Sequence, residues 1–237
     1  MRTSVVGGTA RAVARSAAPG VVRDAARGAV HASRRRLGTV RLRRLLAQSP
    51  PPYRLELGAG AVRRQGWIGT DVAPNARYQL DATACWPFPP ESISHLYADN
   101  MIEHVPLDGA RSLLREARRK LLPGARLRLV TPDVRECAKA YLEHGEMARA
   151  LVDAHRGAGT RMEHFVDVLR AVYIEYDHYR GYAWDFEALG SELDAAGFTA
   201  IERCQLQCSR DPVLCDLESR VLPVDRVTML AVEAERP

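Results

Sequence analysis

Long apolar segments are missing from this sequence of 237 residues. No apolar run approaches the roughly 20 residues that cross a bilayer, and the N-terminus lacks the continuous apolar stretch of a secretory signal. We therefore expect a cytoplasmic protein. Cysteine is also scarce. The chain has five cysteines, and they lack the paired short spacings that are typical of disulfide frameworks or zinc sites. We expect no metal site, and we place Cys204 and Cys208 on one face of a strand.

Acidic residues are almost absent from residues 1–48, which contain eleven arginines, no lysine and a single acid, Asp24. This segment carries a charge of +10, so the other 189 residues carry −5, although the whole chain has a net charge of +5. The isoelectric point of about 9.1 therefore belongs to the N-terminal arm, and it gives no reason to expect specific binding of nucleic acid. The proline-rich stretch 49–52 separates this basic extension from a domain over residues 49–237.

The arm allows three interpretations. Apolar and basic residues interleave over 34–46, which favours a poorly ordered start followed by a helix that packs on the domain. The same pattern is typical of a basic amphipathic segment in peripheral contact with an anionic membrane or another polyanion. Scarce acids and plentiful arginines also occur in organelle presequences.

Short apolar segments alternate with helical patterns from residue 53 onward. Apolar residues repeat every three to four positions over 107–122, and a second helix over 185–196 has Asp185 as its N-cap. Strands are expected at 53–57, 67–72, 77–80, 94–98, 126–130, 198–208 and 226–235. This alternation is typical of a Rossmann-like α/β fold, a mostly parallel seven-stranded sheet with helices on both faces. The last two strands have no helix between them and predict an antiparallel C-terminal hairpin.

The strand ends supply the candidate ligand-binding residues, because ligands bind outside the carboxyl ends of the strands in an open parallel sheet. The segment Gly58-Ala-Gly60 follows the first strand, and its lack of large side chains lets a ligand lie against the backbone. Glu56, just before it, can accept a hydrogen bond from a cationic amine. Asp71 ends the second strand, where a carboxylate can bind both ribose hydroxyls. Asp81 ends the third strand, in a position to face an adenine amino group.

A dinucleotide site needs more glycines and a longer spacing than this chain offers. That motif requires a third glycine, a full helix facing the pyrophosphate and an acid about 20 residues further on. The third-glycine positions hold Val62 or Arg63, and only ten residues separate Gly60 from Asp71. A ligand with a ribose, an adenine and an amino acid suits this spacing better. An NAD-dependent oxidoreductase of similar architecture is therefore the weaker alternative.

Several motifs occur in an order that resembles a known enzyme family. They are Leu55-Glu-Leu-Gly-Ala-Gly60, Gly66-Trp-Ile-Gly-Thr-Asp71, the segment 87–97, Ile102-Glu-His104, Leu121-Leu-Pro-Gly124 and Val130-Thr-Pro-Asp133. Together they resemble the class I S-adenosylmethionine-dependent methyltransferases of the methyltransferase-11 type. Within that type, the sequence is most similar to predicted methyltransferases associated with surface-polysaccharide synthesis. The resemblance covers residues 53–135 well and residues 178–220 more loosely.

This resemblance implies S-adenosyl-L-methionine as the cofactor. Gly58 and Gly60 would line its methionine moiety, Asp71 would hold the ribose, and Asp81 would face the adenine. The implied cofactor site as a whole is formed by Glu56, Gly58, Ala59, Gly60, Asp71, Val72, Asp81, Ala82, Asn100 and Met101. The family commonly has cysteine or glycine at the position of Ala59. It often has histidine at the position of Asn100, so we expect Asn100 only to shape the pocket.

Methyl transfer to a hydroxyl needs alignment and a base. Three candidate bases follow from the sequence: His104 and Asp133 after strands, and His178 in the His- and Tyr-rich segment 134–184, which we interpret as a helical lid over the acceptor. Each has a structural interpretation too: Glu103 and His104 can be a pair that fixes the loop, His178 can be non-catalytic, and Asp133 can be a helix N-cap. We expect O-methylation of a sugar or glycan hydroxyl, or of another small molecule. A non-catalytic protein that binds an adenosyl ligand and polyanions is the alternative from another class.

Overall fold

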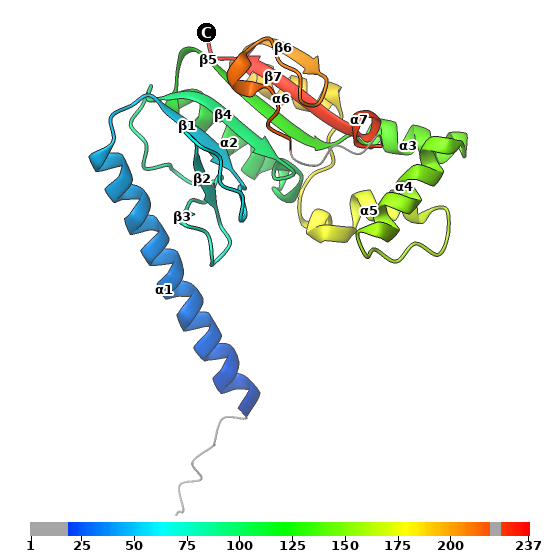
Figure 1. The fold of residues 1–237 in the computed structure, drawn as a ribbon, viewed down its shortest axis with the longest axis horizontal. Coiled ribbons are helices and arrows are strands. Elements are labelled where there is room, and N and C mark those ends of the chain that lie inside the picture. Colours follow the sequence, from blue (N-terminus) through cyan, green and yellow to red (C-terminus); the bar gives the residue numbers. More distant parts are fainter. Residues whose placement is uncertain (1–18, 219–223) are drawn as a thin grey trace, which may run out of the picture.

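The computed structural model describes residues 19–218 and 224–237. Its centre is a seven-stranded sheet in the order β3-β2-β1-β4-β5-β7-β6 (Figure 1). The strands are β1 (Tyr53–Leu57), β2 (Ile68–Asp71), β3 (Tyr78–Gln79), β4 (Ile93–Asp99), β5 (Leu121–Pro132), β6 (Thr199–Cys204) and β7 (Met229–Glu235). Strands β1 to β5 pair in parallel, whereas β7 runs antiparallel to both β5 and β6. This arrangement confirms the predicted Rossmann-like α/β fold with its antiparallel C-terminal hairpin.

One face of the sheet packs against α2 (Leu107–Lys120) and α6 (Phe186–Ala195). The apolar stripe of α2 is fully buried at Ala110, Leu113, Leu114 and Ala117. It packs in one hydrophobic cluster with the β5 side chains of Leu127 and Leu129, which point to the same face because side chains alternate along a strand. The predicted N-cap is also confirmed, since the Ala188 backbone N–H donates to the Asp185 side chain at the start of α6.

The opposite face is covered mainly by the segment 205–218, which contains the short helix η3 (Pro212–Leu214). A buried ion network ties this segment to the sheet. Arg128 Nε lies 2.6 Å from Glu218 Oε1, and Arg128 Nη1 lies 2.5 Å from Glu233 Oε1. The same guanidinium donates to the carbonyls of Gln205 and Cys208. In the described part of the chain, long helices therefore cover one face, whereas the alternation of strands and helices predicted helices on both.

Four predicted strands are shorter in the structure, and the last two, β6 and β7, differ most from their predicted bounds. β6 ends at Cys204, and the chain turns away at Gln207, whose φ of 62° is left-handed. Cys208 is consequently exposed in a loop, so the prediction that Cys204 and Cys208 share a strand face is wrong. The last strand begins at Met229, because residues 225–228 form the helical turn α7 (Asp225–Thr228).

The basic arm ends in one long helix, α1 (Pro19–Gln48), which extends far from the sheet in Figure 1. Its last turns pack against β3: Leu42 is fully buried, and Gly38 lies against the side chain of Gln79. The helix thus begins earlier than the predicted segment 34–46, and residues 1–18 lie outside the described part of the chain. Among the described residues, no helix is long and apolar enough to cross a membrane.

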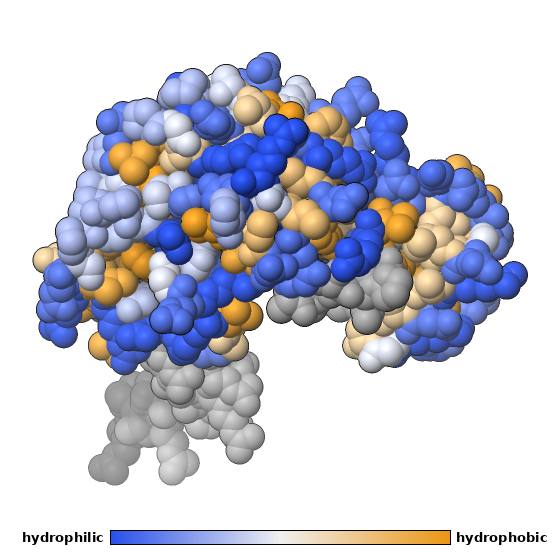
Figure 2. All heavy atoms as spheres, turned by 45° about the horizontal axis from the view of Figure 1, so that its top comes forward, coloured by the Kyte–Doolittle hydropathy of each residue, from blue (hydrophilic) through white to orange (hydrophobic). Residues whose placement is uncertain are grey.

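The predicted insert over residues 134–184 is helical. It contains α3 (Val134–Glu143), α4 (Glu146–Gly157), α5 (Asp167–Tyr173) and the 3-10 helix η2 (Glu175–Arg180). Its helices form a hydrophobic cluster of their own around Ala148, Leu151, Val168 and Ala171. Figure 1 shows these helices beside the sheet, beyond the end of β5. Hydrophilic and hydrophobic residues are mixed over the face that Figure 2 shows.

Candidate functional site

The glycine segment after β1 is hydrogen-bonded to the end of β2. The Gly60 backbone N–H donates to Asp71 Oδ2 at 2.8 Å, and the Ala73 N–H donates to Asp71 Oδ1 at 2.7 Å. The Ala59 N–H donates to the Thr70 carbonyl. Both glycines have left-handed backbones, with φ of 69° at Gly58 and 55° at Gly60, where a Cβ would be strained. The structure therefore brings the predicted glycines and Asp71 together in one bend at the carboxyl edge of the sheet.

The two glycines differ in what surrounds them. A Cβ on Gly58 would lie 2.5 Å from Met101 Cγ, so the predicted residue Met101 packs directly on this glycine. A Cβ on Gly60 would meet no atom of the described part of the chain within 4 Å, and this residue is exposed. Open space beside a backbone with a fixed bend is what a ligand needs to approach the main chain closely. Gly60 thus marks the open side of the bend, and Gly58 marks its packed side.

Glu56 lies in β1, two residues before the bend, and is 4% exposed. Its Oε1 accepts from Arg64 Nε at 3.1 Å, while its buried Oε2 has no hydrogen-bond partner among the described residues. Burial raises the pKa of this carboxyl, and the neighbouring Arg64 guanidinium only partly opposes that shift. An additional cationic donor at Oε2 would satisfy the buried oxygen and favour the ionised form.

The remaining predicted cofactor residues lie at the ends of β3 and β4 or just after β2. Asp81 is exposed, and its Oδ1 accepts from the Thr83 N–H at 2.9 Å and from the Thr83 hydroxyl at 2.7 Å, which leaves Oδ2 outside both bonds. Asn100 follows β4 with a φ of 48°, and its N–H donates to the Val130 carbonyl. Val72 is 54% exposed. Ala82 is partly buried and packs against the main core.

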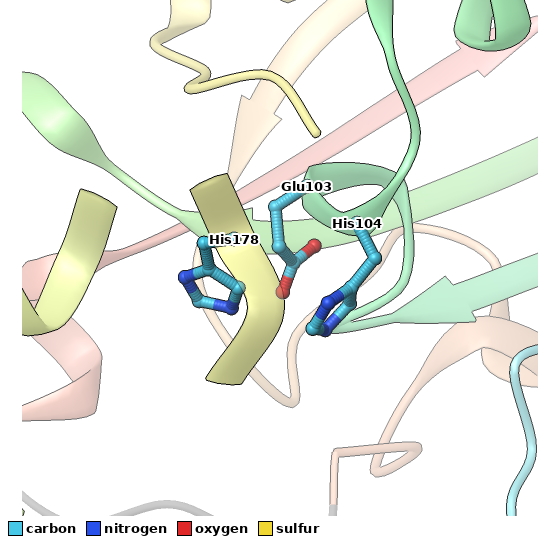
Figure 3. A group of neighbouring side chains, drawn as sticks. All are labelled: Glu103, His104 and His178. Carbon is cyan, nitrogen blue, oxygen red and sulfur yellow. The ribbon is translucent and has the colours of Figure 1, made fainter. Parts of the chain in front are cut away.

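Glu103, His104 and His178 form a cluster next to this edge. Their ligating oxygen and nitrogen atoms all lie within 4.8 Å of one another. The two imidazole rings meet edge to face, with centroids 4.8 Å apart. Figure 3 shows the Glu103 carboxylate pointing between the two rings, with Glu103 and His104 from the 3-10 helix η1 (Ile102–His104) and His178 from η2. Two of the three predicted bases therefore meet, although 74 positions separate them in the sequence.

A pocket of about 180 Å³ opens beside this cluster. It is lined by Glu103, Pro132, Val134, Tyr173, His178, Tyr179, Gly181, Tyr182 and Ala183. Three of these residues are tyrosines of the predicted lid, so the wall offers both aromatic surface and hydroxyl groups. Tyr176, which belongs to the same tyrosine-rich stretch, lies outside the residues whose side chains are described. The pocket wall therefore combines aromatic, carboxylate, imidazole and hydroxyl groups.

The third predicted base, Asp133, has structural contacts on both carboxylate oxygens. It is fully buried and caps α3, since its Oδ1 accepts from the backbone N–H groups of Arg135 and Glu136. Its Oδ2 accepts from Arg203 Nη2 at 2.7 Å. The structure thus shows the N-cap interpretation of Asp133, and its catalytic role stays a prediction.

Three residues that were not predicted as site residues also shape the site. Arg64 holds Glu56 and lies over the Tyr97 ring, with 5.2 Å from the guanidinium carbon to the ring centroid. Gly181 lets η2 approach η1, because a Cβ there would lie 1.7 Å from the Glu103 carbonyl oxygen. Thr131 donates to Glu103 Oε2 at 3.1 Å. The contacts of Gly181 and Thr131 with Glu103, and of Arg64 with Tyr97, join segments that are distant in sequence, so local spacing could not reveal them.

Comparison with known proteins links the chain to solved structures only. No protein-family model matches the sequence, and no curated protein is significantly similar to it. A methyltransferase of Thermotoga maritima, S-adenosylmethionine-dependent and described as a possible histamine N-methyltransferase, is 16% identical with a TM-score of 0.47, over 92% of this chain and 96% of that one. An S-adenosylmethionine-dependent methyltransferase of Archaeoglobus fulgidus is 15% identical with a TM-score of 0.46, over 85% and 94%.

Longer proteins also match. Phosphoethanolamine N-methyltransferase 2 of Haemonchus contortus, in complex with S-adenosyl-L-methionine, is 14% identical with a TM-score of 0.45, over 84% of this chain and 51% of that one. The chain spans about half the length of this protein and of the CurJ carbon methyltransferase. At such identities and scores these likenesses concern the fold, and they assign no substrate to this chain.

Proposed function

We propose that this protein is an S-adenosyl-L-methionine-dependent methyltransferase that methylates a hydroxyl of a sugar, a glycan or another small molecule. The observation that carries the proposal is the bend in which Gly60 donates to Asp71, with open space beside the glycine. This bend brings an exposed backbone, a carboxylate at the end of β2 and a buried acid in β1 to one edge of the sheet. The chain has no room between Gly60 and Asp71 for the helix that a dinucleotide site requires.

The residues present fit the three parts of the proposed cofactor. The unpartnered Oε2 of Glu56 suits the cationic amine of its methionine moiety, because a buried carboxylate oxygen gains most from a charged donor. Each Asp71 oxygen accepts one backbone N–H and retains a lone pair, which suits the two ribose hydroxyls. Asp81 is exposed two residues beyond β3, in a position to accept from the adenine amino group.

The acceptor would occupy the tyrosine-lined pocket. Methyl transfer is an in-line displacement: the acceptor oxygen forms the new bond to the methyl carbon as the bond from carbon to sulfur breaks. S-adenosylhomocysteine leaves, and the hydroxyl proton must pass to a base. His178 lines the pocket and contacts His104, so these two imidazoles are better placed for that proton than Asp133. Holding both reactants in line can lower the barrier by about 7–11 kcal/mol.

Titration calorimetry of the full chain with S-adenosylmethionine, S-adenosylhomocysteine and NAD tests the proposal. We expect both sulfur ligands to bind and NAD not to bind. The Asp71→Ala variant should bind S-adenosylhomocysteine about 10- to 150-fold more weakly, since losing a charge-assisted hydrogen bond costs about 1.5–3 kcal/mol. Asp108→Ala is the matched control, because the Asp108 side chain is 96% exposed on α2.

Each other result contradicts a defined part of the proposal. If the protein binds neither S-adenosylmethionine nor S-adenosylhomocysteine, the methyltransferase proposal is wrong. Binding of NAD would favour the oxidoreductase alternative. Binding of S-adenosylhomocysteine without methyl transfer to any glycan or small hydroxyl compound would favour the non-catalytic adenosyl-binding alternative. An association with surface polysaccharide, and contact of the basic arm with a membrane or polyanion, stay predictions from the sequence.

A further inference from the structure

The Glu103, His104 and His178 cluster combines one carboxylate with two imidazoles beside the proposed acceptor pocket. Glu103 is buried, His178 is partly buried and His104 is exposed, so the cluster reaches from the protein interior to the surface. Two histidines and one carboxylate are a ligand set that divalent transition metals prefer, and such sets leave coordination positions open.

One other group of described residues has ligand atoms equally close together, and its two carboxylates pair with arginines. In the group of Glu202, Cys204 and Glu233, the Glu233 oxygens accept from Arg128 and Ser209. Glu202 pairs with Arg126, and burial raises the pKa of the Cys204 thiol to about 11, which disfavours the thiolate. That group is therefore part of the buried ion network of the sheet.

Backbone contacts fix the two elements that carry the ligands. The Tyr182 N–H donates to the Glu103 carbonyl, and the Trp184 indole N–H donates to the Ile102 carbonyl. Gly181 allows this close approach, since any larger residue would overlap the Glu103 carbonyl. The Thr131 hydroxyl donates to Glu103 Oε2 and so orients the carboxylate. Oriented ligands of this kind bind metals more tightly than freely rotating side chains do.

We propose that Glu103, His104 and His178 bind one divalent transition-metal ion. Bonds of about 2.1 Å around a tetrahedral ion would bring pairs of ligand atoms to about 3.4 Å, so the present limit of 4.8 Å requires movements of roughly an ångström. Exposed His104 can supply such a movement by rotating its side chain. Three protein ligands leave at least one coordination position open toward the tyrosine-lined pocket.

The open position suits an acceptor oxygen, and this part of the inference rests on the proposed function. A metal-bound hydroxyl loses its proton to solvent more readily than a free one, because the cation stabilises the alkoxide. The two histidines would then act as ligands, and the metal would replace a protein base. Metal binding itself requires only the three side chains, so it can be tested without any methyl acceptor.

Equilibrium dialysis of tag-free, EDTA-stripped full chain against Zn²⁺ or Mn²⁺, followed by elemental analysis, tests the site. We expect one equivalent of bound ion. His178→Ala and Glu103→Gln should each weaken binding at least tenfold, whereas His164→Ala, an exposed histidine of the same insert, should leave it unchanged. Mg²⁺ should bind more weakly than Zn²⁺ or Mn²⁺, because imidazole is a poor ligand for it.

A second measurement does not depend on how the variants fold. Substoichiometric Mn²⁺ should broaden the imidazole proton resonances of His104 and His178 in the wild-type chain and spare those of His164. Broadening that spares the pair, binding below one equivalent, or unchanged affinity in His178→Ala would each overturn the site. If the chain binds S-adenosylhomocysteine but no metal ion, the proposed function stands and only the metal site is refuted. If the chain binds the metal ion but not S-adenosylhomocysteine, the metal site stands and the proposed function is refuted.

Discussion

Substituting Gly58 and Gly60 by alanine should separate the packed side of the glycine bend from its ligand side. Both residues have positive φ, so either alanine stores strain of about 1–2 kcal/mol in the folded state. The alanine methyl at position 58 also overlaps Met101, 2.5 Å away, which adds about 1–3 kcal/mol for overpacking. Gly58→Ala should therefore lower the free energy of unfolding by about 2–5 kcal/mol in total.

Gly60→Ala should affect ligand binding more than folding. Its methyl group meets no protein atom within 4 Å, so the loss of stability should stay near the strain alone, about 1–2 kcal/mol. If the methionine moiety of the cofactor occupies that space, the methyl group opposes binding by about 1–3 kcal/mol, or about 5- to 150-fold in affinity. Gly124→Ala is the matched control: Gly124 has a φ of 74° and the same open surroundings, far away in β5.

Urea unfolding and calorimetric titration with S-adenosylhomocysteine measure the two effects separately. Gly60→Ala and Gly124→Ala should lose similar stability, but only the first should lose affinity. Combining Gly58→Ala with Met101→Ala should cost less stability than the two single losses together, because the second change removes the overlapping side chain. A folded Gly60→Ala protein that binds within twofold of wild type would refute the placement of the cofactor at this bend.

Three further outcomes follow from single buried contacts. Burial raises the pKa of Glu56, so its ionised form destabilises the fold. The wild type should therefore lose stability relative to Glu56→Gln as the pH rises above about 4.3, the pKa of an unperturbed glutamate. Urea unfolding between pH 4 and 8 measures this difference. Asp133→Ala should be less stable than Asp133→Asn by about 0.5–2 kcal/mol in the same assay, because asparagine still caps α3. Normal methylation by the asparagine variant would contradict the prediction that Asp133 is the base. Leu42→Ala should cost about 2–5 kcal/mol of stability, since Leu42 is fully buried in the core, and an unchanged urea midpoint would show that α1 does not stabilise the domain.

The sheet was predictable because its signals are local. A buried strand such as Tyr53–Leu57 shows its apolar pattern within five residues, and α2 repeats its apolar stripe over four turns. Strand ends were less predictable. β6 stops at Cys204 because the chain then turns toward the opposite face of the sheet. There Leu206 packs in a hydrophobic cluster, and the carbonyls of Gln205 and Cys208 accept hydrogen bonds from Arg128. That contact spans about 80 residues and leaves no trace in the pattern around Cys204.

The site divides in the same way. The glycine bend could be predicted, since Gly58, Gly60 and Asp71 lie within 14 positions and the rule for strand ends places them at one edge. The pairing of His104 with His178 could not, because it depends on how η2 docks on η1 through Gly181. The expectation that there is no metal site rested on the lack of closely spaced cysteines. That pattern speaks only to sites whose ligands are close together in the sequence.

The position of Glu103 connects the two halves of the proposed site. It lies two residues after Met101, whose side chain packs on Gly58, and it carries the carboxylate between the two histidines of the cluster. A displacement of the bend therefore reaches the cluster through one short segment, Met101 to Glu103, that is held by the Trp184 indole at Ile102. If the cofactor binds at Gly60 and the acceptor at His178, this segment sets the alignment between methyl group and acceptor oxygen. In that case the hydrogen bond from Trp184 to this segment would help to hold the two reactants in alignment.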